Sequence, residues 1–326
     1  MHAQQIYETV SSDFQAVDTL IKEQLFSRVP LVESIGRYIT DSGGKRMRPL
    51  VVLLTANAAG LASDSVRRDC IKLAAIIEFL HTATLLHDDV VDTSELRRGR
   101  STANAKWGNA PSVLVGDFLY SRSFEMMVEL RDLAVMEILS QATSIIAEGE
   151  VLQLMNVRNP DLTEEQYMDV IRSKTAMLFQ ASSHSAAVLA TDNVAIQEAM
   201  RDYGLYLGMA FQLADDVLDY RGSAEEMGKN VGDDLAEGKC TLPLIHTMKV
   251  GTEAQRNLVR QAIRQAGLEQ LPQILEAVES CGALEHTLNL AHAYVEKAVA
   301  CLDGLADSPH KEALAALARL AVNRSK

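Results

Sequence analysis

Two short acidic motifs contain the residues of this chain that are best suited to chemistry. Each motif has aspartates at its first, second and fifth positions, in the segments Asp88 to Asp92 and Asp215 to Asp219. Both follow apolar stretches with helical spacing, so the aspartates should lie at or beside a core. A carboxylate there needs a cation or several hydrogen bonds.

Helical geometry places the outer aspartates of each motif together. Residues four apart lie on one helix face, which pairs Asp88 with Asp92 and Asp215 with Asp219. Two such faces turned toward each other would repel unless metal ions lay between them. Oxygen ligands of this kind suit Mg2+, which keeps waters and bridges to substrate phosphates. The sequence therefore predicts a magnesium site and a phosphorylated ligand.

Basic side chains that could bind phosphate occur in four groups. The first group, Lys45, Arg46 and Arg48, follows two glycines, and the second, Arg97 and Arg98, follows the first motif. The third is Lys174, beside Thr175 in an apolar stretch, and the fourth is Lys229 and Lys239, which flank the loop after the second motif. Any one group could be a solvated surface, but an unpaired lysine in an apolar helix is costly. His81 and Gln212 could each be ordinary core residues. Their helix faces are shared with the motif aspartates, which favours a place in the site.

Composition limits the class of protein. The chain has 326 residues, of which 48% are hydrophobic, and a net charge of -13. Such an acidic protein is poorly suited to bind nucleic acid. Its four cysteines form no Cys-x-x-Cys pair, which fits a reduced intracellular protein. The N-terminus lacks a signal-peptide core, and no apolar run approaches the roughly 20 residues that a bilayer requires. We therefore expect a soluble, cytoplasmic protein without a transmembrane segment.

Helical periodicity dominates, and no segment alternates as a strand would. We expect an all-α, single-domain antiparallel helical bundle over residues 1–326, with its site between facing helices. Thr163 and Thr252 begin capping boxes, and Pro309 follows a capping Ser308. The predicted helices cover residues 4–27, 31–40, 49–60, 65–92, 111–130, 133–157, 164–190, 194–221, 241–249, 252–266, 269–279, 284–304 and 309–322.

The paired Asp-Asp-x-x-Asp motifs, together with two longer segments, make the chain resemble the trans-prenyl diphosphate synthases. The segments are Gly43-Gly44-Lys45-Arg46-Met47-Arg48-Pro49 and His81 to Arg100. The chain is most similar to the long-chain, octaprenyl diphosphate synthase type that makes quinone side chains, through Gly116 to Arg122, Ala147 to Leu154 and Gly228 to Leu235. The resemblance implies an isoprenoid synthase bundle around a central cleft, several Mg2+ ions and a homodimer.

The resemblance also implies a role for each matching residue. Asp88, Asp92, Asp215 and Asp219 would hold Mg2+ on the allylic diphosphate, which Arg97, Lys174 and Lys229 would also bind; Lys45, Arg48, His81 and Arg98 would bind isopentenyl diphosphate; Thr175 and Gln212 would orient the substrates and stabilise the carbocation; and Lys239 would support the second motif. Cleavage of the allylic C–O bond puts negative charge on diphosphate, which metals and fixed cations stabilise. Attack by isopentenyl diphosphate then lengthens the chain by one isoprene unit.

Product length should depend on the helix before the first motif. Ala83 and Thr84, five and four residues before Asp88, are small, so a growing chain could pass where an aromatic side chain would block it. We therefore expect extension of farnesyl diphosphate or a similar primer to an octaprenyl or nonaprenyl diphosphate for ubiquinone or menaquinone. Met126 and Met127 are candidates for the floor of the tunnel, although methionine in an apolar helix often simply fills a core.

Four alternatives remain. A shorter-chain synthase of the geranylgeranyl type would share all these motifs. A di-iron or other metal-binding bundle could use Glu78 and His81, but the second Glu-x-x-His that such sites need is missing from the sequence. A non-catalytic partner subunit should have lost one aspartate motif, and a class I terpene cyclase would carry a different second motif.

Overall fold

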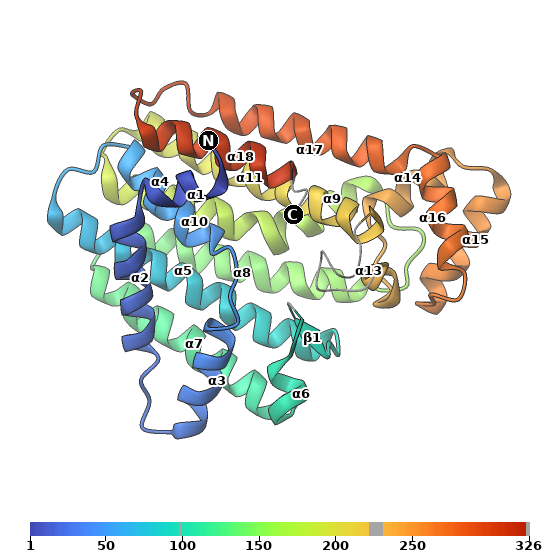
Figure 1. The fold of residues 1–326 in the computed structure, drawn as a ribbon, viewed down its shortest axis with the longest axis horizontal. Coiled ribbons are helices and arrows are strands. Elements are labelled where there is room, and N and C mark those ends of the chain that lie inside the picture. Colours follow the sequence, from blue (N-terminus) through green and yellow to red (C-terminus); the bar gives the residue numbers. More distant parts are fainter. Residues whose placement is uncertain (98, 222–230, 324–326) are drawn as a thin grey trace. The chain divides into compact units, whose positions relative to one another are not determined.

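Helices form nearly all of the regular structure in the computed structural model, which describes residues 1–97, 99–221 and 231–323 (Figure 1). The first helices are α1 (Ala3–Glu8), α2 (Ser11–Gln24), α3 (Pro30–Thr40), α4 (Met47–Ala58), α5 (Asp64–Val91), α6 (Ala103–Trp107), α7 (Asn109–Leu130) and α8 (Leu133–Met155). They are followed by α9 (Glu164–Ile171), the π-helical turn η1 (Arg172–Ala176), α10 (Met177–Ala190), α11 (Val194–Arg221), α13 (Asp233–Ala236), α14 (Leu242–Val250), α15 (Glu253–Gln265), α16 (Leu271–Ser280), α17 (Ala283–Ala300) and α18 (Pro309–Val322). The predicted all-α class is confirmed.

Side-chain caps explain where several helices begin. The predicted capping boxes are present at Thr163 and Thr252, where each threonine accepts the N–H of a glutamine three residues on and that glutamine's side chain accepts the threonine N–H. Ser308 accepts from the N–H of Lys311 at 3.1 Å, and Pro309 is the first residue of α18. The helix starts that were predicted from these motifs are therefore confirmed.

The structure differs from the predicted helices at several points. The helix predicted over residues 4–27 is divided at Val10, whose backbone (φ -131°, ψ 24°) is not helical, so α1 ends and α2 begins there. The helix predicted over 164–190 contains η1, and the short helices α6 and α13 were not predicted. A small antiparallel hairpin, β1 (Leu96–Arg97) with β2 (Arg100–Ser101), follows the first motif.

The chain divides into two compact units, each assembled from three segments. Unit 1 contains residues 1–142, 178–204 and 301–317, and unit 2 contains residues 143–177, 205–300 and 318–326. The first acidic motif belongs to unit 1 and the second to unit 2. The single domain over residues 1–326 stays a prediction.

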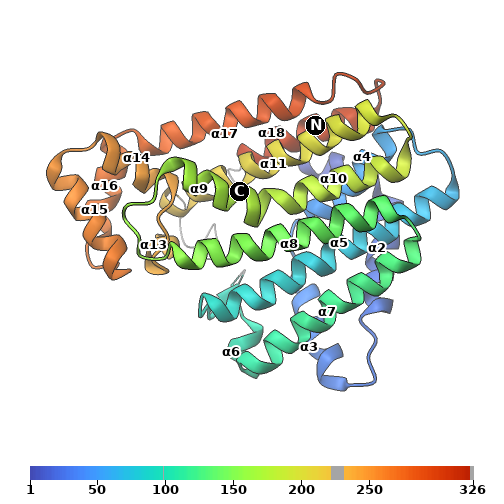
Figure 2. The same ribbon diagram turned by 180° about the vertical axis from the view of Figure 1, so that it is seen from behind.

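Unit 1 is organised around α5. This helix runs alongside α7, and α4 and α2 also pack against it, as Figures 1 and 2 show from opposite sides. Leu50, Leu54, Leu73 and Ile76 are 0% exposed in this core. Burial of these apolar side chains fixes α5 and the motif at its end.

By length and composition α5 could also cross a membrane. Its most apolar 18-residue window has a mean hydropathy of 1.3, although no such run was expected from the sequence. Because 61% of that window is buried inside the protein, α5 is accounted for as a core helix.

Unit 2 contains a smaller cluster of helices in which α14 contacts α15, α16 and α17. Val259, Ile263, Ile274 and Val278 are 0% exposed there.

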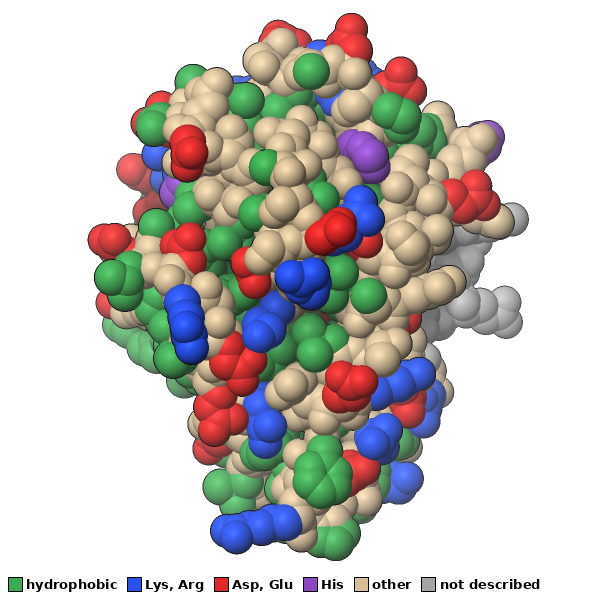
Figure 3. All heavy atoms as spheres, turned by 90° about the vertical axis from the view of Figure 1, so that its left-hand side faces the viewer, with side chains coloured by type: hydrophobic (Ala, Val, Ile, Leu, Met, Phe, Trp, Pro, Cys, Tyr) green, Lys and Arg blue, Asp and Glu red, His purple; other side chains and the backbone are tan. Residues whose placement is uncertain are grey.

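One face of the protein shows acidic and basic side chains interspersed with apolar ones, so the net negative charge does not produce a uniformly acidic surface on that face (Figure 3).

Candidate active site

The first acidic motif forms the end of α5. Asp88 and Asp92 are partly exposed, and the N–H of Asp92, the residue that caps the helix, donates to the Asp88 carbonyl at 2.8 Å. Asp89, the second aspartate, is 0% exposed. The motif therefore offers its outer carboxylates to solvent and buries the carboxylate between them, as helical spacing requires.

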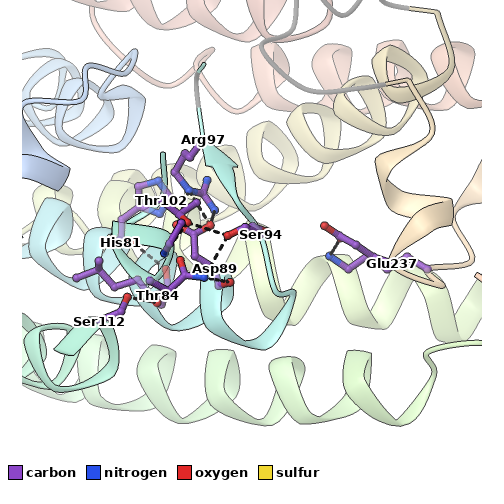
Figure 4. Close-up of polar contacts among 12 residues, drawn as sticks. His81, Thr84, Asp89, Ser94, Arg97, Thr102, Ser112 and Glu237 are labelled. Atoms are coloured by element: carbon purple, nitrogen blue, oxygen red, sulfur yellow. Dashed lines mark hydrogen bonds and ion pairs between the residues drawn. The ribbon is translucent and has the colours of Figure 1, made fainter. Parts of the chain in front are cut away.

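Asp89 binds Arg97 of the hairpin. Both carboxylate oxygens accept from Arg97 Nε at 3.1 Å, and Oδ1 also accepts from Nη2 at 2.7 Å (Figure 4). The amide of Asn104 donates to the carbonyls of Asp89 and Ser94, and the Thr102 hydroxyl donates to the Ser94 carbonyl at 2.7 Å. These contacts fasten the hairpin to the end of α5, and they fix Arg97 while leaving its side chain 22% exposed.

Among the residues predicted to bind isopentenyl diphosphate, Arg48 and His81 lie on α4 and α5, and Lys45 precedes α4. Arg48 Nη1 lies 3.2 Å from His81 Nε2, and its guanidinium stacks on the Phe179 ring at 4.3 Å from the centroid. Because arginine can only donate, Nε2 of His81 must be the acceptor. Lys45 is exposed, and its carbonyl accepts from the Tyr7 hydroxyl. Arg48 and His81 are thus brought together, and their binding of isopentenyl diphosphate stays a prediction.

Lys174 and Thr175 lie in η1, where the helix bulges by one residue. Lys174 Nζ donates to Glu150 Oε2 and Gln153 Oε1, both at 2.7 Å. These partners on α8 explain how a lysine is tolerated within an apolar helix. A Cβ on Gly149 would lie 2.8 Å from the Ser173 Cβ and 3.0 Å from the Lys174 backbone nitrogen, so this glycine permits the close approach of α8 and η1.

A chain of hydrogen bonds leads from Thr175 into the second motif. The Thr175 hydroxyl donates to Gln212 Oε1 at 2.9 Å, and Gln212 Nε2 donates to Asp216 Oδ1 at 2.8 Å. The Tyr167 hydroxyl donates to the other carboxylate oxygen of Asp216. Asp216 is 1% exposed. Burial raises the pKa of its carboxyl, and the charge of Asp234 raises it further, while the bonds from Tyr167 and Gln212 act in the opposite direction.

The outer aspartates of the second motif differ in exposure. Asp215 is exposed, whereas Asp219, which was predicted to share its helix face, is 7% exposed. The Asp219 carbonyl accepts from the N–H of Gly232, the residue that precedes α13, at 3.0 Å. Lys239 Nζ donates to Glu237 Oε2 at 2.6 Å. Its predicted support of the second motif stays a prediction.

The carboxylates of the first motif fit Mg2+ by their chemistry. In the described ranges, no three histidine, cysteine or acidic side chains gather closely enough to enclose a metal. The partly exposed side chains of Asp88 and Asp92 supply oxygen ligands, which suit an ion that keeps waters and shares substrate oxygens. Two predicted diphosphate-binding residues, Arg98 and Lys229, lie outside the described residues.

The residues expected to control product length lie on the paired helices α5 and α7. Ala83, Met126 and Met127 are at most 1% exposed. Thr84 is partly exposed, and its hydroxyl donates to the His81 carbonyl at 2.7 Å. The Ala83 carbonyl would lie 3.3 Å from a Cβ on Gly116, so this part of α5 packs tightly on α7.

The chain is similar to known proteins over its entire length. A family model described as Polyprenyl synthetase matches residues 29–279. The chain is 51% identical to the octaprenyl diphosphate synthase of Escherichia coli (strain K12), with 100% of both proteins covered. It is 46% identical to the all-trans-nonaprenyl-diphosphate synthase (geranyl-diphosphate specific) of Rhodobacter capsulatus, with 98% of each covered.

A solved structure gives the same result for the fold. The polyprenyl synthase of Caulobacter crescentus CB15, crystallised with calcium and isoprenyl diphosphate, superposes with a TM-score of 0.95 at 44% identity. The match covers 100% of this chain and 98% of that one. The predicted resemblance, the isoprenoid synthase fold and the prenyltransferase class are thereby confirmed, and the chain belongs to the polyprenyl synthetase family.

Proposed function

We propose that this protein is a long-chain all-trans polyprenyl diphosphate synthase, which adds isopentenyl diphosphate repeatedly to an allylic diphosphate. The observation that carries the proposal is its 51% identity over full length to an octaprenyl diphosphate synthase. The similarity to a nonaprenyl diphosphate synthase also supports a long product, so a geranylgeranyl-type product has less support. Octaprenyl diphosphate, with a quinone side chain as its destination, is the expected product.

The allylic diphosphate would bind through the carboxylates of the two motifs and through basic side chains. Asp88, Asp92, Asp215 and Asp219 would hold Mg2+, which supplies positive charge to the leaving diphosphate when bound. Arg97 would add a fixed cation, since its guanidinium is already oriented by Asp89. Lys174, held by Glu150 and Gln153, would add another. Preorganised charge of this kind favours C–O cleavage because it needs no rearrangement as charge develops.

Isopentenyl diphosphate would bind through the other basic group. Arg48 is stacked on Phe179 and bonded to His81, so its donors are restrained before substrate arrives. Lys45 extends from the exposed segment that precedes α4. We infer that Arg98 completes this set.

Thr175 and Gln212 would stabilise the allylic cation. The Thr175 hydroxyl hydrogen is directed to Gln212 Oε1, which leaves the lone pairs of the Thr175 oxygen available for a positive centre. After carbon–carbon bond formation the proton would pass to the released diphosphate. A side-chain nucleophile is not required by this reaction.

The direct test is incubation of purified protein with farnesyl diphosphate, labelled isopentenyl diphosphate and Mg2+. Products extended to about eight isoprene units, separated by reversed-phase chromatography after dephosphorylation, would support the proposal. Termination at four units would support the geranylgeranyl alternative. Lack of any extension in the presence of Mg2+ would refute the synthase assignment.

We also propose a cytoplasmic location and a homodimer.

A further inference from the structure

The second aspartate of each motif is buried and has a complete set of side-chain partners. Asp89 is 0% exposed and Asp216 is 1% exposed, whereas Asp88 and Asp92 are partly exposed and Asp215 is exposed; Asp219, at 7%, is also buried. The carboxylates of Asp89 and Asp216 each have both oxygens in hydrogen bonds to protein side chains. A carboxylate used in this way has little capacity left for a metal ion, although both residues belong to the acidic motifs.

Asp89 acts on Arg97. A guanidinium that bridges both oxygens of a buried carboxylate is fixed in plane and direction, because the bidentate arrangement has one favourable geometry. Asn104 contributes to the same anchoring by donating to the Asp89 carbonyl at 3.2 Å.

Asp216 acts on Gln212, and through it on Thr175. Gln212 turns its amide nitrogen toward Asp216, since Nε2 donates to Oδ1 at 2.8 Å. Its oxygen is then directed at Thr175, whose hydroxyl has to donate. Tyr167 holds the second oxygen of Asp216 and keeps the carboxylate from rotating. The Asp216 carboxylate thus sets the direction of the Thr175 hydroxyl through Gln212.

We propose that Asp89 and Asp216 are positioning residues, which orient Arg97 and the Gln212–Thr175 pair respectively, and that neither is a magnesium ligand. The inference rests on the proposed function, because it assigns Arg97 to the leaving diphosphate and Thr175 to the cation. Tyr167 belongs to the same device, although its position in the sequence shows no relation to the motifs.

The Asp89 arm is tested by steady-state kinetics of Asp89→Asn in the full-length protein. The KM for farnesyl diphosphate should rise about 10- to 100-fold, the range expected for loss of a charged hydrogen-bonded pair. The Mg2+ concentration for half-maximal activity should stay at the wild-type value, while Asp92→Asn, the matched control, should raise it. In an Arg97→Gln background the Asp89→Asn change should add little, because both act on one interaction.

The Asp216 arm predicts a different kinetic signature. In Asp216→Asn the new amide would donate to Gln212, which would flip, so its nitrogen would donate to Thr175 and occupy the oxygen meant for the cation. We expect kcat to fall about 10- to 100-fold with an unchanged KM and unchanged Mg2+ requirement. Tyr167→Phe should lower kcat in the same direction. In a Thr175→Ala background both changes should lose their effect.

Three results would overturn the inference. One is a raised Mg2+ requirement in Asp89→Asn or Asp216→Asn comparable to that of Asp92→Asn. Another is wild-type kinetics in Asp89→Asn, Asp216→Asn and Tyr167→Phe. The third is full additivity in both double-variant backgrounds. Circular dichroism checks folding, and if Asp216→Asn does not fold, Tyr167→Phe decides that arm. Failure of the wild-type protein to extend farnesyl diphosphate would instead refute the proposed function.

Discussion

Asp88 is the residue whose removal should be most informative about metal-dependent chemistry. It is partly exposed near the end of α5, so truncation creates no core cavity. We expect Asp88→Ala to lower kcat/KM by about 10²- to 10³-fold or more, since charge stabilisation at the leaving group is lost. The free energy of unfolding should change by less than about 1 kcal/mol. Assays across Mg2+ concentrations would measure this, and full activity would remove the metal role assigned to Asp88.

Gly149 controls the approach of α8 to η1. Alanine is normally the better helix former by about 1 kcal/mol. The predicted contacts at 2.8 Å and 3.0 Å should reverse that gain in Gly149→Ala, with a net loss of about 1–3 kcal/mol. Activity should fall as well, because Lys174 would shift. Urea unfolding of this variant beside Glu148→Ala, an exposed neighbour on α8, separates the clash from helix propensity.

Side-chain types and spacing predicted much of the candidate site, but not which neighbours support it. The burial of Asp89 beside the partly exposed Asp88 follows from helix geometry once the helix is placed. By contrast, Tyr167 precedes the second motif by many residues and has no local signal, because its bond to Asp216 is a tertiary contact. The same holds for the pairing of Glu150 with Lys174.

Thr84 gives the sharper test of length control on α5. Ala83 is 0% exposed and packs close to α7, so Ala83→Phe, which should also shorten the product, risks overpacking the core. Thr84 is partly exposed, so Thr84→Phe should place an aromatic ring before Asp88 with less strain. We expect shorter products with the first condensation retained, read by chromatography of the chain lengths. An unchanged distribution in both variants would show that the product avoids this side of α5.

The contact between α14 and α17 should be sensitive to pH. The rings of His246 and His286 stack with centroids 4.0 Å apart, and burial, followed by the charge of His286, lowers the pKa of His246 below its usual 6.5. The unfolded chain therefore takes up a proton first as the pH falls. Stability should be complete above pH 6.5 and decrease below it, toward the folded-state pKa. Urea midpoints at pH 7.5 and 5.5 measure this; His246→Gln should reduce the difference.

The longer helices could be predicted because their apolar periodicity is sustained and their caps are explicit, as at Thr163. The elements that were missed are short. The α6 helix has only a short local signal, Thr102 as its N-cap, and the β1–β2 hairpin is held by bonds such as Thr102 to Ser94, eight residues apart. The π-helical turn was missed because the apolar periodicity continues through it; it packs closely against Gly149, which lies on another helix.

A homodimer would account for an apolar face on α8. Val151, Leu154 and Met155 are 57%, 59% and 76% exposed, and their spacing places them along one side of the helix. Light scattering should give twice the chain mass of 35.7 kDa. Leu154→Glu should shift the protein toward the monomer, because a carboxylate would be buried in the contact. A monomeric wild-type protein at micromolar concentration would contradict the prediction.

The π-helical turn has a consequence for how this sequence can change by insertion and deletion. A π turn contains one residue more than a regular turn, so loss of a single residue within Arg172–Ala176 would restore an ordinary α-helix. Each residue turns a helix by about 100°. Such a deletion would leave helix content almost unchanged while rotating Tyr167 relative to Thr175, and the hydrogen-bonded chain through Asp216 could not close. The number of residues in this helix is therefore constrained, as well as their types.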